Sequence, residues 1–174
     1  DGRLVKDGGG ITPDVVMEPD SLPDMLEELA LSEQFFDYTV KYLNTHRELA
    51  PADSFHISDV DFQDFLSFME KSSFTYHTQT KRMLDYLKKW ADYEGYSDSI
   101  QTEMTALATK LAPNVAGDLR RWQKEVRELL EYAIVSSHYG HEGAYAYKIR
   151  NDKELQLSTE ILLDKERYHK LLRK

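Results

Sequence analysis

Apolar residues recur along most of the chain at the spacing of a helix face. Phe62, Phe65, Leu66 and Met69, for example, stand at offsets of zero, three, four and seven, which places them on one side of a helix. Capping residues and helix breakers divide the pattern into segments. About seven helices are predicted, near residues 23–29, 32–48, 58–69, 79–94, 97–111, 118–139 and 151–172.

The connections between these segments are short. Pro51 and Pro113 end the helices before them, and Gly95 stands where a helix end favours a left-handed residue. Short connections favour antiparallel packing of neighbouring helices. The prediction for residues 20–174 is therefore an all-α domain, an irregular multi-helix bundle.

Each predicted helix has a face that we expect to be buried. In segment 32–48 this face carries Phe35, Phe36, Val40 and Leu43. Trp90 and Trp122 lie on apolar stripes of their helices, so we expect both in the core. Other stripes are formed by Met83, Leu84, Leu87 and Ala91, and by Leu119, Val126, Leu129, Leu130, Ala133 and Ile134.

The front of the chain has a different pattern. Arg3–Val5 is strand-like, Gly8-Gly9-Gly10 forms a turn, and Asp14–Met17 is a second extended run. Pro13 fixes its own φ and holds the residue before it extended. Residues 1–19 are therefore predicted to form a short N-terminal β arm that is marginal by itself.

This front motif resembles a known protease segment. Gly2-Arg3, Gly9-Gly10-Ile11 and Pro13-Asp14 follow the order found at the end of the protease domain in carboxyl-terminal processing (tail-specific) serine peptidases of a Bacteroidetes-like type. The resemblance covers about residues 1–18. In that family a catalytic serine and its lysine base lie upstream of the motif, and Lys6 stands too far into the motif to be that lysine.

The resemblance implies a function for the longer protein. Residues 1–19 would be the end of a protease domain, and residues 20–174 a helical C-terminal domain that gates substrates or holds subunits together. The parent would be a serine endopeptidase that cleaves proteins near their C-termini, in the periplasm or cell envelope of a bacterium. Its partners would be protein or peptide substrates, with possible self-association.

Charge and composition exclude several classes of function. The 174 residues carry a formal charge of −9, from 31 acidic and 22 basic side chains, which disfavours nucleic acids and anionic membranes. No apolar run approaches the ~20 residues that span a bilayer. Disulfides and thiolate metal sites are excluded because the chain has no cysteine.

Three clusters invite a chemical interpretation. His138, His141 and Glu142 could share a cation, but Gly140 interrupts the helix face between the histidines. Ser136, Ser137 and His138 are adjacent on a helix and point in directions about 100° apart, so no activating bond can form. Gly8-Gly9-Gly10 lacks the spacing of a phosphate loop. We assign no catalytic, cofactor or metal residue.

Aromatic and charged side chains suggest surfaces. Eleven tyrosines are present, and Tyr145 and Tyr147 fit a core or an interface equally well. Tyr93, Tyr96 and Tyr139 are further candidates for an interface. Basic and acidic residues alternate along the long helix in the pairs Arg121–Glu125, Lys124–Glu128 and Arg127–Glu131, which predicts a solvated face alongside Arg120.

A second hypothesis is a non-enzymatic interaction module that docks partners through residues 139–149. It predicts that the front segment packs on the bundle and buries Val5, Ile11, Val15 and Val16. The protease hypothesis predicts that the same segment is extended and poorly packed on the helices. The burial of these four side chains therefore separates the two hypotheses.

Overall fold

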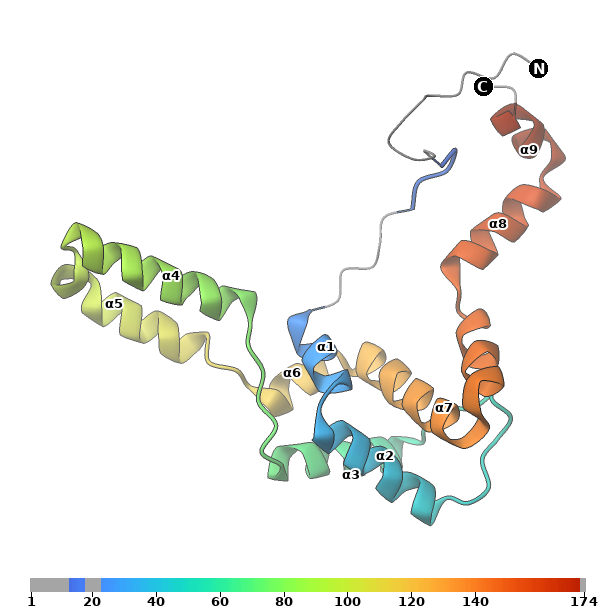
Figure 1. Cartoon of the computed structure of the whole chain (residues 1–174), viewed down its shortest axis with the longest axis horizontal. Coiled ribbons are helices and arrows are strands. Elements are labelled where there is room, and N and C mark those ends of the chain that lie inside the picture. The colour runs from blue at the N-terminus through green and yellow to red at the C-terminus, as the bar shows by residue number, and fades with distance from the viewer. Residues whose placement is uncertain (1–12, 18–22, 173–174) are drawn as a thin grey trace.

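A computed structural model describes residues 13–17 and 23–172 (Figure 1). Those residues form nine α-helices and no strand, which confirms the all-α prediction. The helices are α1 (Asp24–Ala30), α2 (Glu33–Thr45), α3 (Asp59–Lys71), α4 (Gln79–Glu94), α5 (Ser97–Lys110), α6 (Val115–Arg121), α7 (Gln123–Ile149), α8 (Lys153–Leu163) and α9 (Lys165–Leu172).

The count of seven helices is wrong because two of the predicted helices are divided. Trp122 leaves helical geometry, with φ −103° and ψ 30°, and separates α6 from α7. Asp164 separates α8 from α9, and its carboxylate accepts the Arg167 N–H at 3.0 Å as a new helix cap. The apolar period runs through both breaks, so periodicity alone does not reveal them.

The N-terminal β arm is not found in the described part of the chain. Asp14 and Val15 lie in a bend, and Asp14–Met17 forms no strand. Val16 is 73 % exposed and Val15 is half-buried, as expected for a front segment that does not pack on the bundle. Other parts of the prediction lie outside the described residues: the strand Arg3–Val5, the side chain of Ile11, and the boundary between residues 19 and 20.

Five helices enclose the core. α7 packs along α1 and α2, while α3 packs against α2 and α6. Tyr38 and Phe65 meet edge to face at 5.0 Å in its centre, the geometry that aromatic rings prefer. The largest side chains that are fully buried are Tyr38, Phe62, Phe65, Leu26, Leu29, Met69, Leu119, Leu130, Ile134, Val126 and Val135.

The buried face of α2 differs from the prediction. Tyr38, Thr39 and Tyr42 are buried with Phe35, whereas Phe36 and Val40 are exposed. The Tyr38 hydroxyl donates to the Asp61 carbonyl at 2.7 Å and the Thr39 hydroxyl to the Phe35 carbonyl at 3.0 Å. Because these polar groups keep a hydrogen bond, tyrosine and threonine can replace purely apolar residues in the core.

Local signals determine several of the helix ends. Ser32, Ser58 and Thr78 each accept the N–H three residues onward, so each caps a helix. Gly95 has φ 83° and ends α4, with the Gly95 and Tyr96 N–H groups donating to α4 carbonyls.

Two helical pairs project from this body (Figure 1). α4 and α5 form an antiparallel hairpin that extends to one side, which we call the arm, and α8 and α9 extend in another direction. Only Leu84, Ala91 and Met104 are buried in the arm, and none of them belongs to the core cluster of the body. The arm is therefore held by its own contacts and by its base.

A kink at Gly140 turns α7 back, so that its last residues pack against its earlier turns. Gly140 has φ 68° and ψ −156°, a backbone region that is essentially restricted to glycine. A Cβ on Gly143 would lie 2.2 Å from Cβ of Tyr139, so this position also requires glycine. The segment after the kink, predicted to be irregular, is helical and buries Ala144 and Tyr147.

The kinked helix closes on a buried carboxylate, Glu131, which is 4 % exposed. Its Oε2 accepts the Tyr147 hydroxyl at 2.7 Å and Arg150 Nη2 at 2.9 Å. Its Oε1 accepts the Ile57 N–H at 3.0 Å and lies 3.4 Å from Nδ1 of His56. Glu131 was predicted to lie on a solvated face with Arg127, and that prediction is wrong.

The same network holds the long connection between α2 and α3. Arg150 also donates to the Phe55 carbonyl at 2.8 Å, and its guanidinium lies 4.0 Å from the Tyr147 ring centre. Arg127 donates to the Ile57 carbonyl at 3.2 Å, and its guanidinium lies 4.1 Å from the Phe62 ring centre. These contacts let Phe55 and Ile57 enter the core from a segment without helical structure.

We predict that Glu131→Ala lowers the free energy of unfolding by roughly 3–5 kcal/mol, because Arg150 is left charged and mostly buried without its partner. Urea unfolding followed by circular dichroism measures this loss. Glu128→Ala is the control, since Glu128 lies on the same helix with an exposed side chain. Equal losses in the two variants would contradict the role of the network.

We also predict a loss of stability at alkaline pH. Burial raises the pKa of Tyr38, Tyr42, Tyr76 and Tyr147 above the ordinary value of 10.0. A raised tyrosine pKa contributes stability that is complete below pH 10 and is lost as the pH rises further, because only the unfolded chain then releases these protons.

The test compares the free energy of unfolding at neutral pH and above pH 10 in the wild type and in Tyr38→Phe. The variant should lose less stability on going to alkaline pH, because it lacks one of the four buried hydroxyls. Tyr145→Phe, at an exposed position, is the control. An alkaline loss that is the same in all three proteins would refute this assignment.

Candidate functional site

The structure separates the residues that suggested chemistry. The Ser136 hydroxyl donates to the Ala133 carbonyl at 3.1 Å, and the exposed His138 ring lies against Tyr139. The non-helical Gly140 lies between His138 and His141. Within the described residues no three His, Cys, Asp or Glu side chains gather as metal ligands. Gly8-Gly9-Gly10 lies outside those residues.

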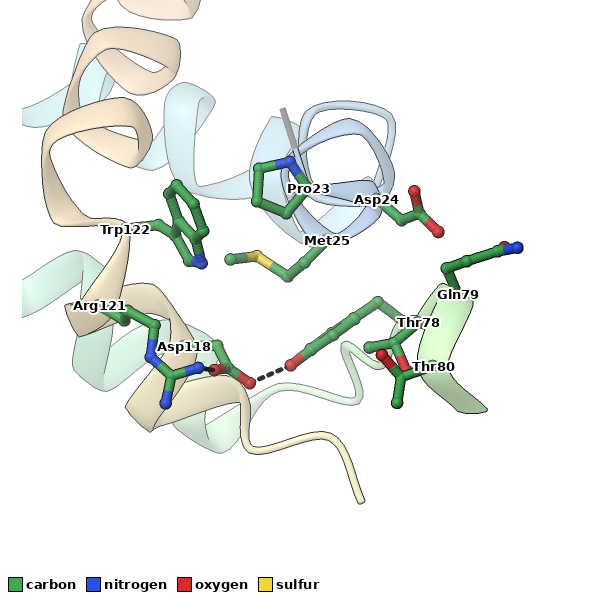
Figure 2. Close-up of a pocket in the computed structure, with 10 residues that line it drawn as sticks. Pro23, Asp24, Met25, Thr78, Gln79, Thr80, Asp118, Arg121 and Trp122 are labelled. Atoms are coloured by element: carbon green, nitrogen blue, oxygen red, sulfur yellow. Dashed lines mark hydrogen bonds and ion pairs between the residues drawn. The ribbon is translucent and has the colours of Figure 1, made fainter. Parts of the chain in front are cut away.

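A pocket of about 470 Å³ lies at the base of the arm (Figure 2). Pro23 and Met25 at the start of α1 line it together with Trp122. Asp118 and Arg121 of α6 lie across from them. The first residues of α4 close the remaining side. The pocket therefore lies where α1, α6 and the start of α4 meet, at a joint between elements.

Several polar groups of this joint bind one another. The Tyr76 hydroxyl donates to the Asp118 carboxylate, which also lies 3.4 Å from Arg121 (Figure 2). Burial, and then the bond to Asp118, raises the pKa of Tyr76 well above its ordinary value. Tyr76 and Phe74 are buried on alternate positions of the connection to α4.

Charged contacts attach the arm to the first helix of the body. Arg82 in α4 forms an ion pair with Asp24, the first residue of α1. The His77 N–H donates to both oxygens of the Glu28 carboxylate at 3.1 Å. The arm is therefore held beside the point where the chain enters the helical body.

The outer side of the arm exposes a large apolar surface. Its side chains, which we call the aromatic face, lie along α4 and are 46 % to 83 % exposed. The aromatic face consists of Met83, Tyr86, Leu87, Trp90 and Tyr93. Trp90 meets Tyr86 and Tyr93 edge to face at 6.1 Å and 5.8 Å. These rings and Lys89 surround a hollow of about 330 Å³.

The comparison with protein families fits a domain of this architecture. A family model described as "Probable PDZ-protease, C-terminal helical domain" matches residues 25–162, which is more than half of the chain. The chain belongs to this family. No curated protein and no solved structure matches it. The family assignment supports the resemblance to a protease at the level of its C-terminal domain.

Within this helical domain the aromatic predictions have mixed outcomes. Trp122 packs against the core, but Trp90 is exposed, and its assignment to the core is wrong. Tyr147 is buried and Tyr145 is exposed. Tyr139 is partly exposed, and its hydroxyl donates to the Leu49 and Ala50 carbonyls at 3.0 and 3.2 Å.

The aromatic face was predicted only in part: Tyr93 was an interface candidate, but the apolar stripe of its helix, Trp90 included, was assigned to the core. One signal was present: the apolar stripe of α4 includes Tyr86 and Tyr93 as well as Leu84 and Ala91. A stripe of that width is broader than one partner helix can cover. No helix in the described ranges is long and apolar enough to cross a membrane.

We predict that Arg82→Ala loosens the base of the arm without unfolding the domain. Amide hydrogen exchange should increase in residues 77–82, while the global free energy of unfolding falls by less than about 1 kcal/mol, because the Arg82–Asp24 pair is half-exposed. Lys81→Ala is the matched control, since Lys81 pairs with Asp85 inside the arm. The prediction fails if both variants exchange alike at the base.

Proposed function

We propose that this domain is the non-catalytic C-terminal part of a carboxyl-terminal processing serine endopeptidase, exported to the periplasm or cell envelope of a bacterium. The family assignment and the motif Gly9-Gly10-Ile11 with Pro13-Asp14 support this proposal. The chemistry would belong to a serine–lysine pair in the protease domain of the parent protein. The role proposed for the helical domain is to control how protein substrates reach that domain and to assist its assembly.

The observation that carries the proposal is the position of the arm. Its base is ion-paired to Asp24, in the first turn of α1, and the protease-like motif ends at Asp14, ten residues earlier in the chain. An apolar surface on a projecting hairpin is suited to contact proteins, because it offers area and aromatic rings with wet polar tips. The arm is thus the element through which the domain would act on substrates or subunits.

The test removes the arm from the parent protease. Residues 79–110 are replaced by a short Gly-Ser linker, which leaves the core cluster intact because that cluster contains no residue of α4 or α5. We predict that kcat/KM for a small peptide is retained, whereas kcat/KM for protein substrates falls by about tenfold, equivalent to ~1.4 kcal/mol of lost interaction in the transition state.

A second variant, Trp90→Ala, keeps the arm and alters only its aromatic face. It should reproduce part of the loss on protein substrates. Val60→Ala, at an exposed apolar position on α3, is the control for loss of surface apolar area. If both substrates are cleaved at unchanged rates without the arm, the arm does not control access. If small peptides and proteins lose activity equally, the domain supports the catalytic fold instead.

A further inference from the structure

The aromatic face of the arm has no covering element in the described part of the molecule. Its five side chains are at least 46 % exposed, and α5 lies on a different side of α4, against Leu84 and Ala91. Exposed apolar patches of several rings are rare on monomeric proteins, because removing such side chains from water is favourable. The face therefore requires an occupant.

The area of the face matches one side of a dimer. Its five large side chains are about half exposed or more. With roughly 150–250 Å² for each aromatic ring, they offer on the order of 600 Å². A standard interface uses about 800 Å² per partner, and polar residues at the rim supply the remainder.

The order of residues along α4 is self-complementary. Arg82 lies near the start of the helix and Glu94 ends it, with the aromatic face between them and Asp85, Lys88, Lys89 and Asp92 interspersed. Lys81 pairs with Asp85 inside the arm, whereas Arg82, although paired with Asp24, is half-exposed and carries further N–H donors. If a second α4 lies antiparallel across a two-fold axis near Lys88, Arg82 of each helix meets Glu94 of the other. In a parallel arrangement like charges would meet.

The same register aligns the apolar side chains. Met83 faces the partner's Tyr93, and Tyr86 faces the partner's Trp90. Each ring thus meets another apolar side chain across the axis, which is the condition for an isologous contact. One feature opposes the pairing: the two copies of Lys89 come close together on one flank of the axis.

We propose that two copies of this chain pair through the aromatic faces of their arms, with the two α4 helices antiparallel. This pairing deepens the assembly role and rests on the proposed function for its purpose in the protease. It joins the two arms through their α4 helices, and the core residues of each copy take no part in it.

The first test is the association state of this chain, measured by sedimentation equilibrium. The wild type should form a dimer, and Trp90→Glu should weaken the dimer by at least about tenfold, because a charge then enters the centre of the face. Val60→Glu, with an equal change at an exposed site on the body, should leave the dimer unchanged. Lys89→Gln should tighten it by removing the like-charge contact at the axis.

A crosslink tests the register. The chain has no cysteine, so Leu87→Cys introduces a single thiol next to the axis. Mild oxidation should yield a covalent dimer rapidly, while Val60→Cys should form the same non-covalent dimer without a crosslink. A wild-type chain that is monomeric at all concentrations would overturn the pairing. So would equal weakening by Trp90→Glu and Val60→Glu.

The outcomes separate this inference from the proposed function. If the chain is monomeric but the parent protease needs the arm to cleave proteins, the aromatic face binds substrates, and the pairing is wrong. If the chain forms the predicted dimer but loss of the arm leaves proteolysis of every substrate unchanged, the pairing stands and the control of access is wrong.

Discussion

The buried carboxylate of Glu131 is the interaction on which the helical body depends. A charged group at 4 % exposure is tolerated only if its oxygens are paired and hydrogen-bonded, and four groups converge on it. Two of them, Tyr147 and Arg150, come from beyond the kink at Gly140, and Ile57 comes from the α2–α3 connection. One side chain thus joins three segments that regular helix packing would not bring together.

The apolar residues of the body and those of the arm differ in burial. In the body, Phe62, Phe65 and Leu130 are fully enclosed and stabilise the fold. In the arm, Trp90 and Tyr93 remain in contact with solvent, and burial of Leu84, Ala91 and Met104 suffices to hold α4 to α5. The body provides stability, and the arm carries surface that is available to other proteins.

Local signals predicted the local structure, and long-range contacts limited the prediction. Ser32, Ser58 and Gly95 act on their own neighbours, so the sequence alone identifies the helix ends they form. Whether Glu131 or Trp90 is buried depends on residues far away in the chain, such as Ile57 and Arg150 for the carboxylate. Helical periodicity gives the angle of a side chain around its helix, but it does not say whether another element covers that angle.

The separation of the arm from the core has a consequence for how such domains can diverge. Because no residue of α4 or α5 belongs to the core cluster, turns can be added to or removed from both helices without repacking the body. Each full turn added to both helices would lengthen the hairpin by about 5.4 Å. The length of the arm can therefore change without a change in the stability of the body. Relatives with the same body could hold their contact surfaces at different distances from the catalytic part.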